Sequence, residues 1–126
     1  MPLARIDLRA GKPADYRAAV GDVVYTALVD VLGVPPNDRF QVIAEHAADG
    51  LIYDPAYLGI NRTDDVILIQ ITLNEGRTVE QKQAFYAAVA TGIHERVGLR
   101  LEDVFINLIE VKKENWSFGN GVAQYA

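Results

Sequence analysis

Residues 13–46 read PADYRAAVGDVVYTALVDVLGVPPNDRFQVIAEH, and residues 78–111, TVEQKQAFYAAVATGIHERVGLRLEDVFINLIEV, repeat their pattern. At an offset of 65 residues, identical residues fall at equivalent places: Gly33 and Gly98, Asp38 and Asp103, and Glu45 and Glu110. Both stretches begin with apolar residues spaced for one face of a helix, in the same phase. Matched identities and a matched period indicate two copies of one structural unit.

Each copy reads as strand, helix and strand. The expected elements are strands at residues 3–8, 39–46, 66–73 and 104–111, and helices at residues 13–32 and 78–97. Pro13 suits a first helical turn, and Thr78 with Gln81 forms a capping-box pattern. Gly33 and Gly98 follow the last apolar helix residues, as left-handed C-caps do. Parallel strands joined by a helix cross over right-handedly. The sequence therefore predicts an α/β fold with a four-stranded sheet and both helices on one face.

Length and composition indicate a single domain spanning residues 1–126, with repeats at about 2–46 and 66–111 and a C-terminal segment at 112–126. A net charge of −5 without basic clusters argues against nucleic acid as a partner. The absence of cysteine excludes disulfides, thiolate metal sites and cysteine nucleophiles. No leader or membrane-spanning run is evident, so a cytoplasmic protein is expected.

One face of the predicted sheet has no helix to cover it. Residues 66–73, VILIQITL, look too apolar on both sides for a strand with one face in water, which predicts a homo-oligomer. The connection at residues 47–66 is long, a length typical of functional or interfacial loops. Its run at residues 50–53, GLIY, is expected to add an edge hairpin.

Pro2 directly precedes the first strand, where a residue without a backbone donor is unusual. If Met1 is removed, the ring nitrogen of Pro2 becomes a free secondary amine. In an apolar pocket, beside a cation, such an amine is largely neutral near pH 7 and can act as a general base. The alternative is that Pro2 is only a tolerated residue at the start of a strand.

The chain resembles the tautomerase superfamily, and within it the malonate semialdehyde decarboxylase-like branch. The resemblance rests on the tandem repeat and on four stretches: Pro2-Leu3, residues 32–41 (LGVPPNDRFQ), Gly59 with Arg62-Thr63, and residues 115–119 (NWSFG). It implies a homotrimer with an amino-terminal proline in each active site, acting on a small carboxylate substrate without a cofactor. It also implies a catalytic role for Asp38, although Asp38 can equally be read as a turn residue, like Asp103.

A carboxylate substrate needs a cation, ideally the fork of an arginine. The decarboxylase pattern has two arginines just after the third strand, where this chain has Asn74 and Gly76. Arg77, one position further, is the first candidate replacement, and Arg62 and Arg39 are further candidates. Trp116 and Phe118 are expected either to wall the active site or to pack in a trimer.

The absence of the arginine pair decides the order in which we rank the possible activities. Keto–enol tautomerisation of a 2-oxo acid such as phenylenolpyruvate needs only one base and one cation, so it is ranked first. A decarboxylase or hydratase like malonate semialdehyde decarboxylase is the second reading, and a trimeric binding protein without catalysis is the third. No metal site is expected, because His46 and His94 have no partner at ligand spacing.

Overall fold

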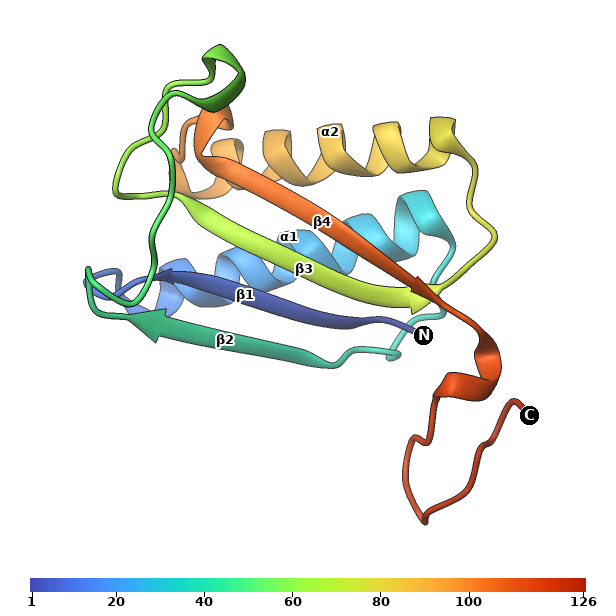
Figure 1. Ribbon diagram of the computed structural model, residues 1–126. Coiled ribbons are helices and arrows are strands. Elements are labelled where there is room, and N and C mark those ends of the chain that lie inside the picture. Colours follow the sequence, from blue (N-terminus) through green and yellow to red (C-terminus); the bar gives the residue numbers. More distant parts are fainter.

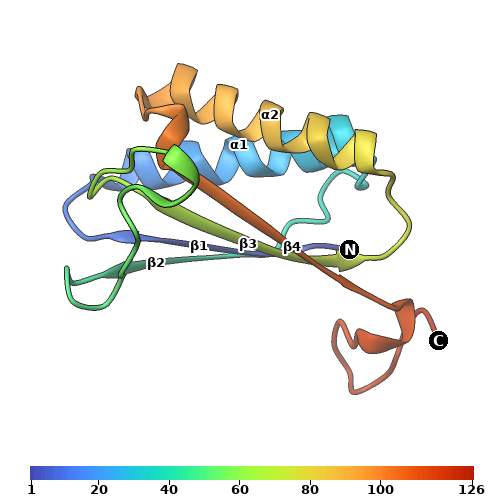
Figure 2. The same cartoon turned by 45° about the horizontal axis from the view of Figure 1, so that its top comes forward.

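The structure, a computed structural model, describes residues 1–126 and contains one four-stranded sheet and two long helices. In chain order the elements are β1 (Leu3–Arg9), α1 (Ala14–Leu32), β2 (Gln41–His46), β3 (Ile67–Asn74), α2 (Val79–Val97) and β4 (Val104–Val111). The strand order is β2-β1-β3-β4, with parallel outer pairs and an antiparallel central pair, β1 with β3. Both helices cover the same face of the sheet (Figures 1 and 2), which confirms the predicted architecture.

The two units share equivalent contacts at the 65-residue offset. The amide of Ala10 donates to the carbonyl of His46, and the equivalent amide of Glu75 donates to the carbonyl of Val111. The ion pair of Arg17 with Glu45 corresponds to that of Lys82 with Glu110. Gly11 and Gly76, also equivalent, have φ of 125° and 124°. The antiparallel pairing of β1 with β3 places the units head to tail. The start of one unit's first strand therefore lies beside the end of the other's.

The helix ends follow the sequence signals closely. Thr78 and Gln81 form the reciprocal capping box, and Gly33 and Gly98 end the helices in the left-handed conformation at φ of 69° and 74°. Pro13 lies just outside α1 with an extended backbone, so it precedes the first turn instead of occupying it. The second strand begins at Gln41, later than predicted, because Arg39 turns back to pair with Asp22.

The core lies between the helices and the inward face of the sheet. Alternate residues of β1 and β3 point into it, among them Ile6 and Ile69, and meet Phe85 from α2. The helices pack closely because Gly92 has no side chain: a Cβ built there would lie 2.7 Å from Cγ1 of Val23. Burial of this apolar surface is the main stabilising contribution to the fold.

The other face of the sheet is open in the single chain. Its side chains from β3 are Leu68, Gln70 and Thr72, so the prediction that β3 is strongly apolar on both sides was wrong. Apolar side chains on this face come instead from its neighbours, and exposed ones include Leu3, Val42, Phe105 and Ile109.

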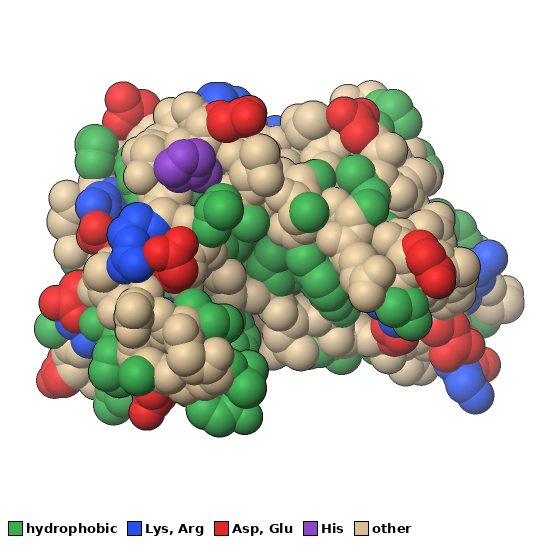
Figure 3. Space-filling model, turned by 90° about the horizontal axis from the view of Figure 1, so that it is seen from above, with side chains coloured by type: hydrophobic (Ala, Val, Ile, Leu, Met, Phe, Trp, Pro, Cys, Tyr) green, Lys and Arg blue, Asp and Glu red, His purple; other side chains and the backbone are tan.

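The connection between the units contains no edge hairpin, so the expectation of one at residues 50–53 was wrong. Leu51 turns into the protein and is buried, while Ile52 next to it is exposed, and the segment forms no ladder. A short 3-10 turn, Tyr57–Gly59, follows, with Leu58 exposed at a positive φ of 60°. Figure 3 shows hydrophobic side chains gathered at this end of the molecule. Neither helix is long and apolar enough to cross a membrane.

Candidate active site

The amino terminus lies where three segments of the chain meet. The register pairs Leu3 with Thr72, so the start of β1 lies beside the end of β3, and the amide of Ala4 donates to the carbonyl of Phe40 just before β2. The segment after β4 leaves the sheet at the same end, where the N and C marks both lie in Figure 1. Pro2 is buried at this junction.

The carboxylate of Asp38 is buried and faces the amino terminus. Its side chain is only 6% exposed, neither oxygen accepts a hydrogen bond, and Oδ2 lies 3.7 Å from the nitrogen of Met1. Buried carboxylates without hydrogen bonds are costly and therefore rare. The amino-terminal nitrogen is the nearest oppositely charged group to this carboxylate.

Asp103, the equivalent residue of the second unit, has the hydrogen-bond partners that Asp38 lacks. It is fully buried, and its carboxylate accepts from the amide of Thr63 at 2.7 Å and from the hydroxyl of Thr63 at 2.6 Å. Thr63 lies just before β3, where the first unit has the amino terminus. Asp103 therefore ties the inter-unit connection to β4, whereas Asp38 has only the amino-terminal nitrogen within ion-pair distance.

The pKa of the amino-terminal amine is lowered, chiefly because burial disfavours the ammonium form. Asp38 opposes this shift, and the positive charges of Arg77 and Lys113 reinforce it. Burial therefore shifts the protonation equilibrium of the Met1 amine toward the neutral form, which can accept a proton.

Arg77 lies within electrostatic reach of the amino terminus and is partly committed to the backbone. Its Nε and Nη2 donate to the carbonyl of Leu32 at the end of α1, and its Nη1 donates to the carbonyl of Asn74. An arginine has five N–H groups, so one remains on each terminal nitrogen. These N–H groups remain available to a carboxylate.

An aromatic cluster from the C-terminal segment lies against this site. Trp116 stacks on Phe118 with ring centres 5.4 Å apart, and Phe118 meets Tyr125 edge-on at the same separation. The indole of Trp116 donates to the side-chain oxygen of Asn74 at 2.8 Å, and the hydroxyl of Tyr125 lies 3.3 Å from Sδ of Met1. Tyr125 was not selected by sequence reasoning, because nothing in an irregular polar tail marks it.

Arg62 and Arg39 lie away from this junction within the chain. Arg62 donates to the carbonyls of Asp54, Tyr57 and Ile60, and so shapes the loop at the far end of β1. The length of that strand, about 20 Å, separates it from Pro2. Arg39 pairs with Asp22 and stacks on Tyr25. Within one chain, the structure brings together the other predicted site residues: Pro2, Asp38, Asn74, Arg77, Trp116 and Phe118.

The two histidines have structural partners. His46 contacts the carboxylate of Asp7 at 2.6 Å on the open face of the sheet, and Nδ1 of His94 lies 2.8 Å from the carbonyl of Leu99. No cluster of three or more histidine or acidic side chains has the geometry to hold a metal ion.

Comparison with known proteins adds to this picture. A family model described as "Tautomerase enzyme" matches residues 38–119, and a second with the same description matches residues 2–61. Two Bacillus subtilis (strain 168) proteins are similar over almost their whole length. Probable tautomerase YusQ is 42% identical over 98% of each chain, and probable tautomerase YrdN is 33% identical over 99% of this chain and 96% of its own.

Solved structures point in the same direction. FG41 malonate semialdehyde decarboxylase inhibited by 3-bromopropiolate has a TM-score of 0.91 at 40% identity, covering 98% of this chain and 93% of its own. A malonate semialdehyde decarboxylase with decarboxylase and hydratase activities has a TM-score of 0.90 at 31% identity, with coverage of 98% and 95%. A fused 4-OT symmetric trimer, at 23% identity and a TM-score of 0.79 over 95% and 94% of the chains, shares the fold.

Proposed function

The chain belongs to the tautomerase family, and from that premise we propose that it interconverts the keto and enol forms of small 2-oxo acids such as phenylenolpyruvate. The general base is the amine of Pro2, exposed by removal of Met1. The observation that carries this proposal is the buried carboxylate of Asp38, which has no hydrogen bond and faces the amino terminus.

The reaction needs one proton to move between oxygen and carbon. The neutral amine of Pro2 accepts the proton of the enol hydroxyl, and the resulting ammonium delivers a proton to carbon 3, which regenerates the amine. Burial lowers the pKa of the Met1 amine, and the same desolvation disfavours the ammonium form of a Pro2 amine at this junction. The carboxylate of Asp38 lies 3.7 Å from the nitrogen of Met1, the residue before Pro2, and its negative charge stabilises the transient ammonium of Pro2.

The substrate carboxylate binds the two free N–H groups of Arg77. The backbone bonds of Arg77 fix its guanidinium in place, so little side-chain entropy is lost on binding. Trp116 and Phe118 form an apolar wall that keeps water from the reacting atoms. Asn74 supports this wall by accepting the indole N–H.

Decarboxylation of a 3-oxo acid, with the related hydration, is the second candidate. It is favoured by the similarity to two malonate semialdehyde decarboxylases. This reaction needs more positive charge in the site than tautomerisation does, because the carbonyl must be polarised as carbon dioxide leaves. Asn74 has no charge, and its side-chain oxygen is occupied by Trp116. Losing one charged contact of this kind costs roughly 10²–10³ in rate. A side-by-side assay of phenylenolpyruvate ketonisation and malonate semialdehyde decarboxylation decides between the two. Decarboxylation without detectable ketonisation would reverse the order.

The decisive test of the base concerns the amino terminus. Mass spectrometry should show mature protein that begins at Pro2. Pro2→Ala keeps a primary amine and should retain weak activity, whereas one additional residue before Pro2 should abolish activity and leave unfolding unchanged. An active protein that retains Met1 contradicts the proposal.

A non-catalytic binding protein of the same fold is the third candidate. An amine-directed reagent such as 3-bromopropiolate separates it from the enzyme. A neutral Pro2 amine is modified near pH 7, whereas an inert scaffold reacts only at high pH. Labelling that first appears at high pH therefore favours a binding role.

We also place the protein in the cytoplasm as a homotrimer. The exposed apolar residues Leu3, Val42, Phe105 and Ile109 on the open sheet face support an oligomer, since such a face is unfavourable in water. The shared fold with a fused 4-OT trimer supports three copies. Sedimentation should give a trimer, and a monomer across micromolar concentrations contradicts this assignment.

A further inference from the structure

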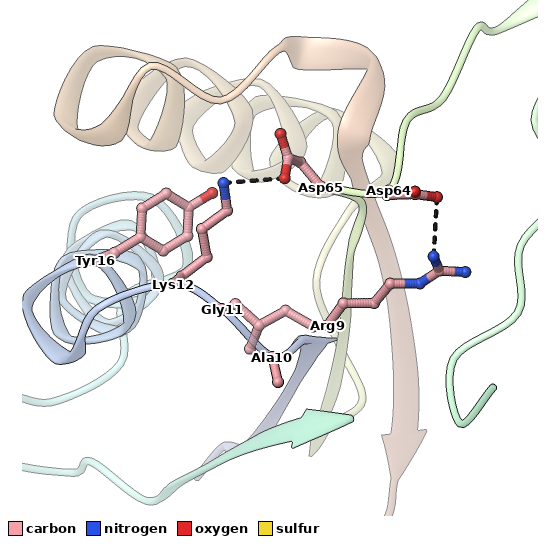
Figure 4. A pocket seen from close by; sticks show the side chains of 8 residues that line it. Arg9, Ala10, Gly11, Lys12, Tyr16, Asp64 and Asp65 are labelled. Atoms are coloured by element: carbon pink, nitrogen blue, oxygen red, sulfur yellow. Dashed lines mark ion pairs between the residues drawn. The ribbon is translucent and has the colours of Figure 1, made fainter. Parts of the chain in front are cut away.

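A cavity of about 370 Å³ lies at the opposite end of the sheet from Pro2, where β1 ends and β3 begins (Figure 4). Two ion pairs line it. Nη1 of Arg9 lies 2.9 Å from Asp64, and Nζ of Lys12 lies 3.0 Å from Asp65. Tyr16, from the first turn of α1, lies beside Lys12. None of these residues takes part in the reaction at Pro2.

The internal repeat relates this cavity to the candidate active site. Position 9 is equivalent to position 74, position 11 to position 76, and position 12 to position 77. In both units the strand ends in a turn with a glycine at a φ near 125°, followed at once by a cation, Lys12 or Arg77. The first unit also has a cation, Arg9, where the second has a neutral asparagine. Its strand end is therefore the more basic of the two.

Several donors in this cavity lack acceptors. Nε of Arg9 is buried without a hydrogen-bond partner, and the backbone amides of Gly11 and Lys12 donate to no protein group. The hydroxyl of Tyr16 remains a donor, because burial raises its pKa. Lys12 remains charged, since the hydrogen bond to Asp65 raises its pKa. Unpaired donors around a cavity of this size favour an anionic ligand.

The carboxylates that now face the two cations lie at the surface, and that of Asp64 also accepts a hydrogen bond from the hydroxyl of Tyr53 at 2.6 Å. The side chains of Asp64 and Asp65 are 74% and 53% exposed. Exposed pairs of this kind contribute little to stability, so an incoming carboxylate can replace them. The amino terminus and the unpaired carboxylate of the Pro2 site have no counterpart here, because the equivalent carboxylate, Asp103, is bound to Thr63.

We propose that this cavity binds a small carboxylate anion without converting it. Arg9 and Lys12 hold the carboxylate in place of Asp64 and Asp65, and the free amides of the turn complete its hydrogen bonds. Each chain then has two sites for the same chemical class, a catalytic site at Pro2 and a binding site at the other end of the sheet.

Titration of the full-length protein with propionate, followed by backbone-amide NMR, tests this proposal. The amide of Gly11 should shift and saturate. Lys12→Met should abolish that shift while leaving any shift of Gly76, at the Pro2 site, unchanged. Asp65→Asn removes the competing carboxylate with little change of shape, and should tighten the affinity at Gly11 about fivefold.

Two outcomes overturn the proposal. One is a shift of Gly11 that does not saturate in either the wild-type protein or Asp65→Asn, or that persists in Lys12→Met. The other is an equal shift with chloride at the same ionic strength, which identifies charge screening only. Catalysis at Pro2 is measured separately, so a failure here leaves the proposed reaction untouched, and the reverse also holds.

Discussion

Replacing Asp38 and Asp103 by alanine, one at a time, tests the proposal that Asp38 serves the reaction whereas Asp103 stabilises the fold. The two residues occupy equivalent places, both precede a strand, and both side chains are almost completely buried. They differ in what they contact. Asp103 accepts two short hydrogen bonds from Thr63, and Asp38 accepts none.

The contacts set the expected changes in the free energy of unfolding. Asp103→Ala leaves the amide and hydroxyl of Thr63 without their acceptor in a partly buried place, at a cost of about 2–4 kcal/mol. Asp38→Ala loses no hydrogen bond and removes a buried charge, so the free energy of unfolding changes by less than about 1 kcal/mol and can increase. Activity should follow the opposite order, because only Asp38 lies at the amino terminus, where we propose that the reaction takes place.

Urea unfolding and phenylenolpyruvate ketonisation measure the two effects on the same samples. Asp103→Ala should be destabilised and, while folded, should retain its kcat/KM. Asp38→Ala should be as stable as the wild-type protein and should lose most of its kcat/KM. Asp38→Asn and Asp103→Asn, which preserve shape, control for cavity formation. Equal destabilisation by the two alanine variants would falsify the distinction.

Other predictions concern the amine, the cation and the helix contact. Burial lowers the pKa of the Met1 amine, and we expect the same effect on the Pro2 amine once Met1 is removed. The fall of kcat/KM on acidification, as the ammonium form accumulates, should therefore begin at a lower pH than the pKa of an exposed prolyl amine. Asp38→Asn removes a charge that raises this pKa, so the acidic limb of the pH profile should move to lower pH; movement to higher pH contradicts the assignment. Arg77→Gln should lower kcat/KM by roughly 10²-fold through the loss of a charged contact, whereas Lys12→Met, its equivalent in the first unit, should leave it unchanged in the same assay. Gly92→Ala places a methyl group 2.7 Å from Cγ1 of Val23. The cost of overpacking should exceed the gain in helix propensity, so the free energy of unfolding in urea should fall by about 1 kcal/mol. A stabilised variant would show that the helices move apart freely.

The sequence alone predicted the repeat, the order of elements and the face that the helices cover. These features depend on local signals: the apolar period of each helix, the capping box at Thr78 and the glycines at positions 33 and 98. Such signals act within a few residues, so they can be recognised from short stretches of the sequence. Where local signals were weak, as in the run at residues 50–53, the expected hairpin did not form, because Leu51 packs inward instead.

The environment of the candidate site was decided by contacts between distant parts of the chain. Trp116 reaches Asn74 across 42 residues, and Tyr125 reaches Met1 across 124. No periodicity or spacing encodes such pairs, since they depend on where the segment after β4 leaves the sheet. Asp38 and Asp103 show the same limit, because they are identical and equivalent in the sequence. Only the tertiary structure distinguishes them, by placing Thr63 against one and the amino terminus against the other.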